Sequence, residues 1–327
     1  MDEYRGQKVL ITGGLGFIGS NLAIRLVEAG ASVTILDSLD PTCGANYFNI
    51  ESIRANVDVV EGNTCDLALV KKLVRGTQFI FNLAGHVSHF ESMQEPFADL
   101  QMNTIGPLTV LEACKHENRE ARVIYAGTRQ AYGRPASLPL EETQLLKPVD
   151  VNGVNKMAGE WYHIVYHQAH GMPAVSLRLA NTYGPRQLVK HARQGFIGWF
   201  IKQAIEGAEI QVFGDGQQLR AFNYVDDVVD AMLIAGINDR VIGDYFNLGG
   251  GQPMTLEAFV QLLLRIAGRG SYRIVPFPPE KKSINIGSVY SSSEKFNAAT
   301  GWAPRISLDV GLARTVEYYQ RCRAHYW

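Results

Sequence analysis

A glycine-rich turn near the N-terminus constrains the fold of this chain more than any other sequence feature. The run Lys8–Thr12 has the apolar and β-branched residues of a buried strand. Three glycines follow it directly in the spacing GxxGxxG: Gly13, Gly16 and Gly19. Residues 20–29 then carry apolar side chains at helical spacing, and 32–36 have the pattern of a second strand that ends in Asp37. This unit of about 30 residues has the length of a parallel strand–helix–strand crossover.

The glycines and the acidic residue after the second strand together predict a dinucleotide site. Gly13 would form the tight turn, Gly16 would let the backbone approach a pyrophosphate, and Gly19 would let the helix pack closely on the strand. The helix N-terminus offers unpaired N–H groups and a partial positive charge to the phosphates. Asp37 can accept both hydroxyls of an adenine ribose and would repel a 2′-phosphate, so NAD is predicted in preference to NADP.

Strands and helices keep alternating through the first half of the chain. Strands are predicted at 57–61, 79–84, 122–126 and 174–178, and helices at 67–74, 98–115 and 156–169. Such alternation is typical of an α/β protein with a doubly wound parallel sheet, the Rossmann arrangement, in which the crossovers are right-handed. We therefore expect residues 1–183 to form an NAD-binding domain.

The pattern changes after residue 184. Helices predicted at 197–205, 228–234 and 256–266 are separated by turns rich in glycine and proline. We expect residues 184–327 to form mainly a smaller α+β lobe that binds the substrate. A strand near 245–249 is expected to return to the first sheet, so the boundary between the two domains is not clean.

Composition and charge exclude several classes of protein. Of the 327 residues, 46% are hydrophobic and 19% are charged, which excludes a mostly disordered chain. The formal net charge is −1 and there is no long basic run, so neither nucleic acid nor a membrane surface is an expected partner. The sequence has no signal peptide pattern and no apolar run of the ~18 residues that suggest a membrane span. The four cysteines are scattered without zinc-ligand spacing, which predicts a cytoplasmic protein with no metal site.

Several segments of the chain resemble one known protein family. Thr12–Gly19 resembles the TGGxGFIG fingerprint of the extended short-chain dehydrogenase/reductases, which include the NAD-dependent nucleotide-sugar epimerases and dehydratases such as the UDP-glucose/galactose 4-epimerases. Further segments similar to that family are Cys65–Leu67, Asn82–Gly85, Arg178–Arg186, Phe213–Arg220, Tyr224–Val228 and Gly301–Pro304. The resemblance covers nearly the whole chain. It implies an NAD cofactor, a nucleotide-sugar substrate, with a UDP-sugar expected first, and a homodimer.

The resemblance also implies a set of binding residues. Those at the NAD are Gly13, Gly16, Phe17, Ile18, Gly19, Asp37, Asp66, Leu67, Leu83, Ala84, Gly85, Asn103 and Lys156. Those at the sugar nucleotide are Thr128, Asn181 and Arg220. An independent argument supports Arg220, because an arginine after a Gly-Asp-Gly turn can make a bidentate contact with a diphosphate.

The catalytic segment departs from the family pattern at one position. In this family a Tyr-x-x-x-Lys pair and a serine or threonine surround the reacting sugar oxygen, and the lysine and the positive nicotinamide help the tyrosine to act as a base. The resemblance places the hydroxyl on Thr128 and the lysine on Lys156. The position of the tyrosine holds Asn152, whose amide has no titratable proton.

The missing tyrosine leaves three alternatives. In the first, another group such as His89, Tyr125 or Tyr183 takes over the proton transfer. His89 follows the fourth strand, at the rim where ligands bind in this topology, and a neutral imidazole there can relay a proton near pH 7. In the second, the reaction needs no such base. In the third, the protein binds NAD and a nucleotide sugar without turning them over. Lys156 can hold the nicotinamide ribose in all three cases.

Two neighbouring residues bear on the type of reaction. The 4,6-dehydratases of the family have Asp-Glu directly after the serine or threonine, to protonate the leaving hydroxyl and to remove the C5 proton, whereas this chain has Arg129 and Gln130. The resemblance therefore favours an epimerase that transiently oxidises a sugar hydroxyl, at C4 first of all. A dehydratase or decarboxylase with relocated acid/base groups is the alternative. Arg129 either attracts an acidic substituent on the sugar, such as a uronate, or faces solvent.

Overall fold

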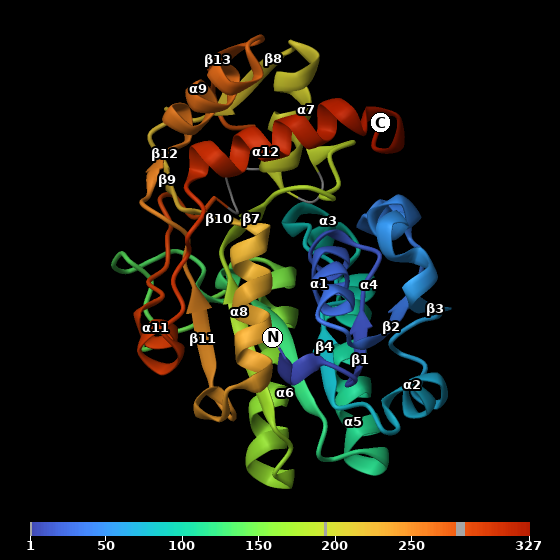
Figure 1. Cartoon of the computed structure of the whole chain (residues 1–327). Coiled ribbons are helices and arrows are strands. Elements are labelled where there is room, and N and C mark those ends of the chain that lie inside the picture. Colours follow the sequence, from blue (N-terminus) through green and yellow to red (C-terminus); the bar gives the residue numbers. More distant parts are fainter. Residues whose placement is uncertain (1, 193–194, 279–284) are drawn as a thin grey trace.

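One parallel sheet organises the larger lobe of the molecule (Figure 1). The computed structural model describes residues 2–192, 195–278 and 285–327, and within them seven strands pair in the order β11-β6-β5-β4-β1-β2-β3. Their bounds are β1 Lys8–Thr12, β2 Ser32–Asp37, β3 Val57–Glu61, β4 Phe79–Asn82, β5 Arg122–Thr128, β6 Ala174–Leu179 and β11 Tyr245–Leu248. All six pairings are parallel, which confirms the doubly wound α/β sheet. The strand order reverses between β1 and β4, the point at which such sheets bind ligands.

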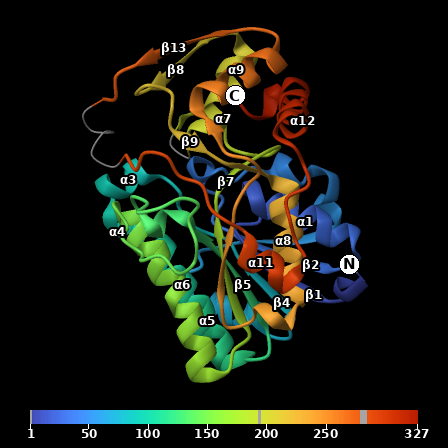
Figure 2. The same cartoon turned by 90° about the vertical axis from the view of Figure 1, so that its left-hand side faces the viewer.

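Alternate residues of the strands face two different helical layers. The helices are α1 (Phe17–Glu28), α2 (Leu67–Val74), α5 (Gly106–Glu117), α6 (Val151–His170) and α8 (Val225–Ile237). In β1, Val9 and Ile11 belong to the core with α1 and α8, whereas Leu10 belongs to the core with α2, α5 and α6. Figure 2 shows α5 and α6 on one side of the sheet and α1 and α8 on the other.

The helix predicted over 98–115 is present, but it contains a π-helical turn. α3 (His89–Gln94) and α4 (Pro96–Leu100) are followed by a π-helical turn at Gln101–Ile105, after which α5 begins at Gly106. Pro107 has no N–H and therefore cannot complete the α-helical hydrogen-bond ladder across this point. The sequence does not indicate this π-helical turn, because the apolar spacing on both sides of it remains helical.

A smaller lobe lies at one end of the sheet (Figure 1). Its main elements are α7 Phe196–Glu206, β8 Glu209–Phe213, β9 Leu219–Arg220, β12 Met254–Thr255, α9 Leu256–Ala267, β13 Ser271–Val275 and α12 Leu308–Arg321. Short strands β7 (Asn181–Tyr183) and β10 (Phe222–Tyr224) pair at the junction of the lobes. The chain passes between the lobes more than once, because α8 and β11 follow residue 184 and yet pack on the large sheet or pair within it. Among the described residues, no helix has both the length and the apolar character needed to cross a membrane.

A buried ion pair attaches α6 to β6. Arg178 and Glu160 have side chains that are 1% and 2% exposed, and the guanidinium donates to both carboxylate oxygens, with an Nη2–Oε1 distance of 2.6 Å. Ser176 donates its hydroxyl to the same carboxylate at 2.8 Å, and the Tyr132 hydroxyl accepts from Arg178 Nη1 at 2.6 Å. Because α6 also carries Lys156, this pair helps to fix where that lysine stands relative to the end of β5.

Candidate active site

A cavity of about 450 Å³ lies where the carboxyl ends of the strands meet the smaller lobe. Most of the side chains expected at a cofactor, a sugar nucleotide or the reacting oxygen line it. These are Gly13, Gly16, Phe17, Ile18, Gly19, Asp37, Leu83, Ala84, Gly85, His89, Thr128, Asn152, Lys156, Asn181 and Arg220. Residues from Gly13 near the N-terminus to Arg220 of the smaller lobe therefore border one space.

Three residues expected at the cofactor lie outside the cavity lining. Asp66 caps α2 by accepting from the backbone N–H of Leu69 at 3.0 Å, and Leu67 is the first residue of that helix. Asn103 is fully buried behind Gly85, where an added Cβ would approach its Oδ1 to 2.5 Å. From the loop before Asp66, Gly62, Asn63 and Thr64 line the cavity instead.

The glycine turn has the geometry that a bound pyrophosphate requires. Gly13 has φ +72°, a conformation that side chains rarely adopt, and a Cβ there would approach Ala84 Cα to 3.0 Å. At Gly19 a Cβ would lie 2.4 Å from the carbonyl oxygen of Gly13, so α1 can approach β1 this closely only with glycine. Gly16 is the N-cap of α1 and supplies no side-chain cap, which leaves the helix N-terminus to a ligand. The turn therefore fits an adenine dinucleotide.

Asp37 lines this cavity at the end of β2. Its two carboxylate oxygens accept from the backbone N–H groups of Leu15 and Leu39, each at 3.0 Å. Burial raises the pKa of Asp37, and the two hydrogen bonds oppose that effect. Each oxygen keeps a second lone pair that can accept a ribose hydroxyl.

Replacing Asp37 with asparagine should weaken NAD binding by about tenfold to a hundredfold, the range expected when hydrogen bonds lose their charge. NADP binding should be weak in the natural protein and should change little or improve in the variant, because the repulsion of the 2′-phosphate is gone. Calorimetry with both dinucleotides measures this change. Asp40→Asn is the matched control, because Asp40 lies three residues further on and does not line the cavity. Equal affinity of the natural protein for NAD and NADP would contradict the role of Asp37.

A histidine–aspartate pair lines the cavity near Thr128. His89 Nδ1 donates to Asp150 Oδ2 at 3.0 Å, and His89 Nε2 contacts the side-chain amide of Gln130. Gln130 in turn donates its backbone N–H to the Thr128 hydroxyl at 3.1 Å. Asp150 also caps α6 through the N–H of Gly153 at 2.7 Å. Burial raises the pKa of Asp150, but His89, the Gly153 N–H and the charge of Arg129 together hold it below its usual value. Asp150 thus remains a carboxylate that orients the imidazole.

Lys156 is buried in the cavity wall and donates from Nζ to the carbonyl oxygen of Ala126 at 3.0 Å. Burial lowers its pKa to about 8, although the charge of Asp99 acts in the opposite direction. An ammonium with two further N–H donors at the edge of the cavity is suited to hold ribose hydroxyls.

Asn152, at the position where the family has its catalytic tyrosine, is fixed in the cavity wall by hydrogen bonds. Asn152 Nδ2 donates to the carbonyl oxygen of His86 and to Asp99 Oδ2, both at 2.9 Å. Asn155 Nδ2 donates to the other oxygen of Asp99 at 2.8 Å. The carboxylate of Asp99 is 1% exposed, and these two amides satisfy it. Asn152 therefore anchors α6 to α4 and to the loop after β4, and takes no proton. No spacing in the sequence links Asp99 to α6.

Two tyrosines considered as substitutes for the missing base do not line the cavity. Tyr125 is fully buried, its hydroxyl lies 3.4 Å from the carbonyl oxygen of Lys156, and burial raises its pKa above the ordinary range. Tyr183 is 1% exposed and donates to the carbonyl oxygen of Leu308, and burial raises its pKa in the same way. Of the three named candidates, only His89 lines the cavity.

Two arginines supply positive charge to the cavity. Arg129 donates from Nη2 to Asn181 Oδ1 at 2.9 Å, and Arg220 donates from Nη1 to the carbonyl oxygens of Leu219 and Gly287. Burial lowers the pKa of Arg129 to about 9, with a contribution from the charge of Arg220, and burial lowers that of Arg220 to about 10. An anionic ligand would relieve both groups.

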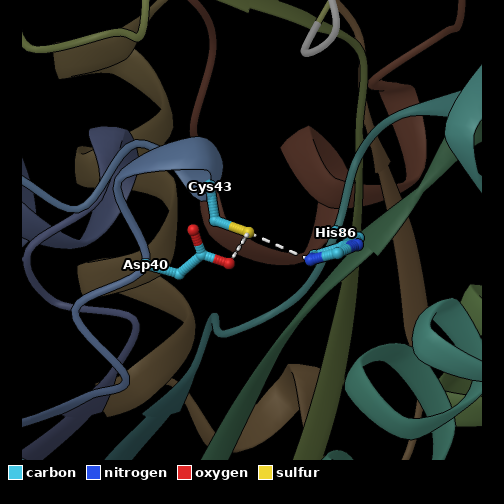
Figure 3. Close-up of side chains that lie close together, drawn as sticks. All are labelled: Asp40, Cys43 and His86. Atoms are coloured by element: carbon cyan, nitrogen blue, oxygen red, sulfur yellow. Dashed lines mark hydrogen bonds between the residues drawn. The ribbon is translucent and has the colours of Figure 1, made fainter.

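The structure also brings together three possible metal ligands, which the spacing of the cysteines does not indicate. Asp40, Cys43 and His86 offer ligand atoms within 4.8 Å of one another. Figure 3 shows Cys43 between the other two: its Sγ lies 3.5 Å from Asp40 Oδ2 and 3.0 Å from His86 Nε2. Burial and the neighbouring carboxylate raise the pKa of the thiol to about 12, so it is protonated near neutral pH. These hydrogen bonds join the loop after β2 to the loop after β4.

Comparison with protein families gives one match over most of the chain. Residues 9–249 match the model of the NAD dependent epimerase/dehydratase family. That segment runs from the first strand to the end of β11 and contains all of the described cavity-lining residues except Asn285 and Ile286.

Individual relatives have different activities. The UDP-glucose 4-epimerase of Mycolicibacterium smegmatis is 30% identical over 317 residues, which cover 96% of this chain and 98% of that protein. The dTDP-glucose 4,6-dehydratase of Streptomyces niveus is 28% identical over 326 residues, covering 97% and 94%. The crystal structure of UDP-glucose 4-epimerase from Thermotoga maritima with UDP-glucose superimposes with a TM-score of 0.86 at 30% identity, over 97% of this chain and 100% of that one.

Proposed function

The chain belongs to the NAD dependent epimerase/dehydratase family, and from this premise we propose that it is a nucleotide-sugar epimerase that transiently oxidises the C4 hydroxyl of a UDP-sugar. Membership makes it an NAD-dependent enzyme with a nucleotide-sugar substrate. The observation that carries the finer proposal is the convergence of Thr128, Lys156 and the His89–Asp150 pair on the cavity that contains the glycine turn.

The residues of the cavity fit the cofactor from end to end. Gly13 and the N-terminus of α1 would hold the pyrophosphate, Asp37 the adenine ribose, and Lys156 the nicotinamide ribose. When bound there, NAD supplies the acceptor and donor of the hydride that leaves and returns to the sugar carbon.

Residues of the chain would bind the substrate and transfer the proton. The Thr128 hydroxyl holds the reacting sugar oxygen, and Arg220 holds the diphosphate. The sugar hydroxyl takes the place of the Gln130 amide at His89 Nε2, which accepts its proton on oxidation and returns it when the hydroxyl is restored. Asp150 keeps the other ring nitrogen protonated and stabilises the imidazolium that forms. This arrangement gives the site a base in place of the absent tyrosine.

The acidic residues of the cavity favour epimerisation over dehydration. Among its described lining residues, only Asp37 and Asp150 are acidic. The first lies at the adenosine end and the second is held by His89 and the Gly153 N–H. Elimination of water needs a separate acid for the leaving hydroxyl, and none of the described lining residues offers a free carboxyl group for that role.

For its assembly we propose a homodimer formed through α6. Val154, Trp161 and Val165 lie on one face of this helix and are 47%, 43% and 48% exposed. A cytoplasmic location remains the prediction drawn from the cysteine pattern.

Incubation of the NAD-loaded protein with UDP-glucose, UDP-galactose and other UDP-sugars tests the reaction type. We expect a product of unchanged mass with inverted C4, detected by chromatography and proton NMR. A product that has lost water or carbon dioxide, visible by mass spectrometry, would instead support the dehydratase or decarboxylase alternative. Tight binding of a UDP-sugar with no product and no reduction of bound NAD would mean that the protein is a non-catalytic binder.

A further inference from the structure

Arg129 is a buried cation that forms no ion pair with any described residue. Arg129 is 8% exposed. Of its two terminal nitrogens, Nη2 donates a hydrogen bond to Asn181. Within the described residues, Nη1 is buried and has no hydrogen-bond partner. The nearby carboxylate of Asp150 is engaged by His89 and by the N–H of Gly153.

The other buried arginine shows what a structural role requires. Arg178 is bound by both oxygens of Glu160 and by the Tyr132 hydroxyl, so its charge is neutralised inside the fold. A guanidinium kept dry without such a partner costs several kcal/mol. Neutral hydroxyl groups offset little of that cost, whereas a carboxylate or phosphate can bind the planar fork with two hydrogen bonds. The cavity side of Arg129 is therefore suited to an anion.

The position of Arg129 indicates which part of a ligand would carry that anion. Arg129 directly follows Thr128 at the end of β5, so their Cα atoms are only about 3.8 Å apart. Arg220 lies in β9 of the smaller lobe, close enough for its charge to contribute to the lowered pKa of Arg129. A ligand whose diphosphate is held by Arg220 and whose reacting oxygen is held by Thr128 places its sugar ring between these two residues, and therefore near Arg129.

We propose that Arg129 binds a carboxylate on the sugar, so that the preferred substrate is a nucleoside diphosphate uronic acid. This inference rests on the proposed function, which places a nucleotide sugar in the cavity. It adds that the hexose carries its charge at the carboxyl group of C6. Asn181 is the positioning residue, because its amide oxygen holds one edge of the guanidinium and leaves the other edge to the ligand.

Calorimetry on the NAD-loaded protein with UDP, UDP-glucose and UDP-glucuronate tests the proposal. The two sugars differ only in a hydroxymethyl group and a carboxylate. We expect UDP-glucuronate to bind about tenfold to a hundredfold more tightly than UDP-glucose, the range for a hydrogen-bonded charge. Arg129→Met should abolish this preference and leave the affinities for UDP and UDP-glucose nearly unchanged. Arg129→Lys, which keeps the charge and loses the planar fork, should keep part of the preference.

Arg220→Met is the matched control, and it should weaken the binding of all three compounds. Thermal unfolding of the ligand-free protein separates a binding role from a structural one. Arg129→Met should not lower the unfolding temperature, because it removes an unneutralised buried charge.

Three results would overturn the proposal, and they have different meanings. Equal affinity of the natural protein for UDP-glucose and UDP-glucuronate would show that no carboxylate site exists, while the proposed function would stand. A loss of UDP affinity in Arg129→Met would assign this arginine to the diphosphate. If UDP itself does not bind, the proposed function fails, and the carboxylate site fails with it.

Discussion

Replacing His89 with asparagine should lower kcat by about 10²–10⁴-fold, the usual contribution of a positioned acid/base group. The imidazole is the only proposed proton carrier beside Thr128, since Asn152 has no proton to exchange and Tyr125 and Tyr183 do not line the cavity. KM for the nucleotide sugar and the affinity for NAD should change far less, because the diphosphate and the pyrophosphate are held elsewhere. Steady-state kinetics and NAD titration measure the two effects separately.

Two further variants make this test specific to the histidine–aspartate pair. Asp150→Asn keeps the cap of α6, since asparagine is also a good N-cap, but an amide can donate to Nδ1 and hold the imidazole in the wrong tautomer. We therefore expect it to lower kcat as well. His86→Asn should leave kcat nearly unchanged, because only the backbone carbonyl of His86 meets Asn152. Added imidazole should restore part of the activity of His89→Gly. Natural turnover in His89→Asn would exclude this histidine as the base.

Replacing Glu160 with glutamine should lower the free energy of unfolding by about 3–5 kcal/mol, the cost of leaving one member of a buried ion pair alone. The side chain of Arg178 is 1% exposed and would keep its charge without a counter-ion. Denaturation by urea measures the change. Glu117→Gln is a control, because the Arg75–Glu117 pair has side chains that are 63% and 22% exposed, and its loss should cost only about 0.2–1 kcal/mol.

The double variant Glu160→Met, Arg178→Met tests whether the loss of stability comes from an unpaired charge or from altered packing. Apolar side chains of similar size often match a buried ion pair, so the pair of changes should cost less than Glu160→Gln alone. A loss below about 1 kcal/mol for Glu160→Gln would mean that water or another group reaches Arg178, contrary to its burial.

Much of the fold could be predicted because local patterns determine it. The predicted strands 8–12, 32–36 and 57–61 lie within β1, β2 and β3, since short β-branched runs next to glycine and polar turns have few other conformations. The strand near 245–249 also coincides with β11. The π-helical turn at Gln101–Ile105 and the two-residue strand β9 could not be predicted in this way, because neither changes the apolar periodicity on which the prediction rests.

Most of the site residues could be located from the glycine turn and the family motifs, but their partners could not. Asp150 and His89 are 61 residues apart, and only the packing of α3 against the start of α6 brings them into contact. Asp99 reaches Asn152 across 53 residues because α4 also packs against α6. The burial of Arg129 was likewise open, because a residue after a strand can turn inward or outward with the same sequence. Local patterns therefore place residues at the edge of the sheet, and tertiary packing decides which of them meet.

The seventh strand has a consequence for dissecting this enzyme. A fragment that stops near residue 183 would retain the glycine turn, Thr128 and Lys156, yet it would lack β11, which pairs with residues 176–179 on the outer side of β6. The backbone of β6 would then form an exposed sheet edge made of buried residues, the kind of surface on which polypeptides associate into aggregates. Truncations or domain swaps intended to exchange the smaller lobe must therefore preserve residues 225–248. These residues belong to the large sheet and its helical layer, although they come after the first elements of the smaller lobe in the sequence.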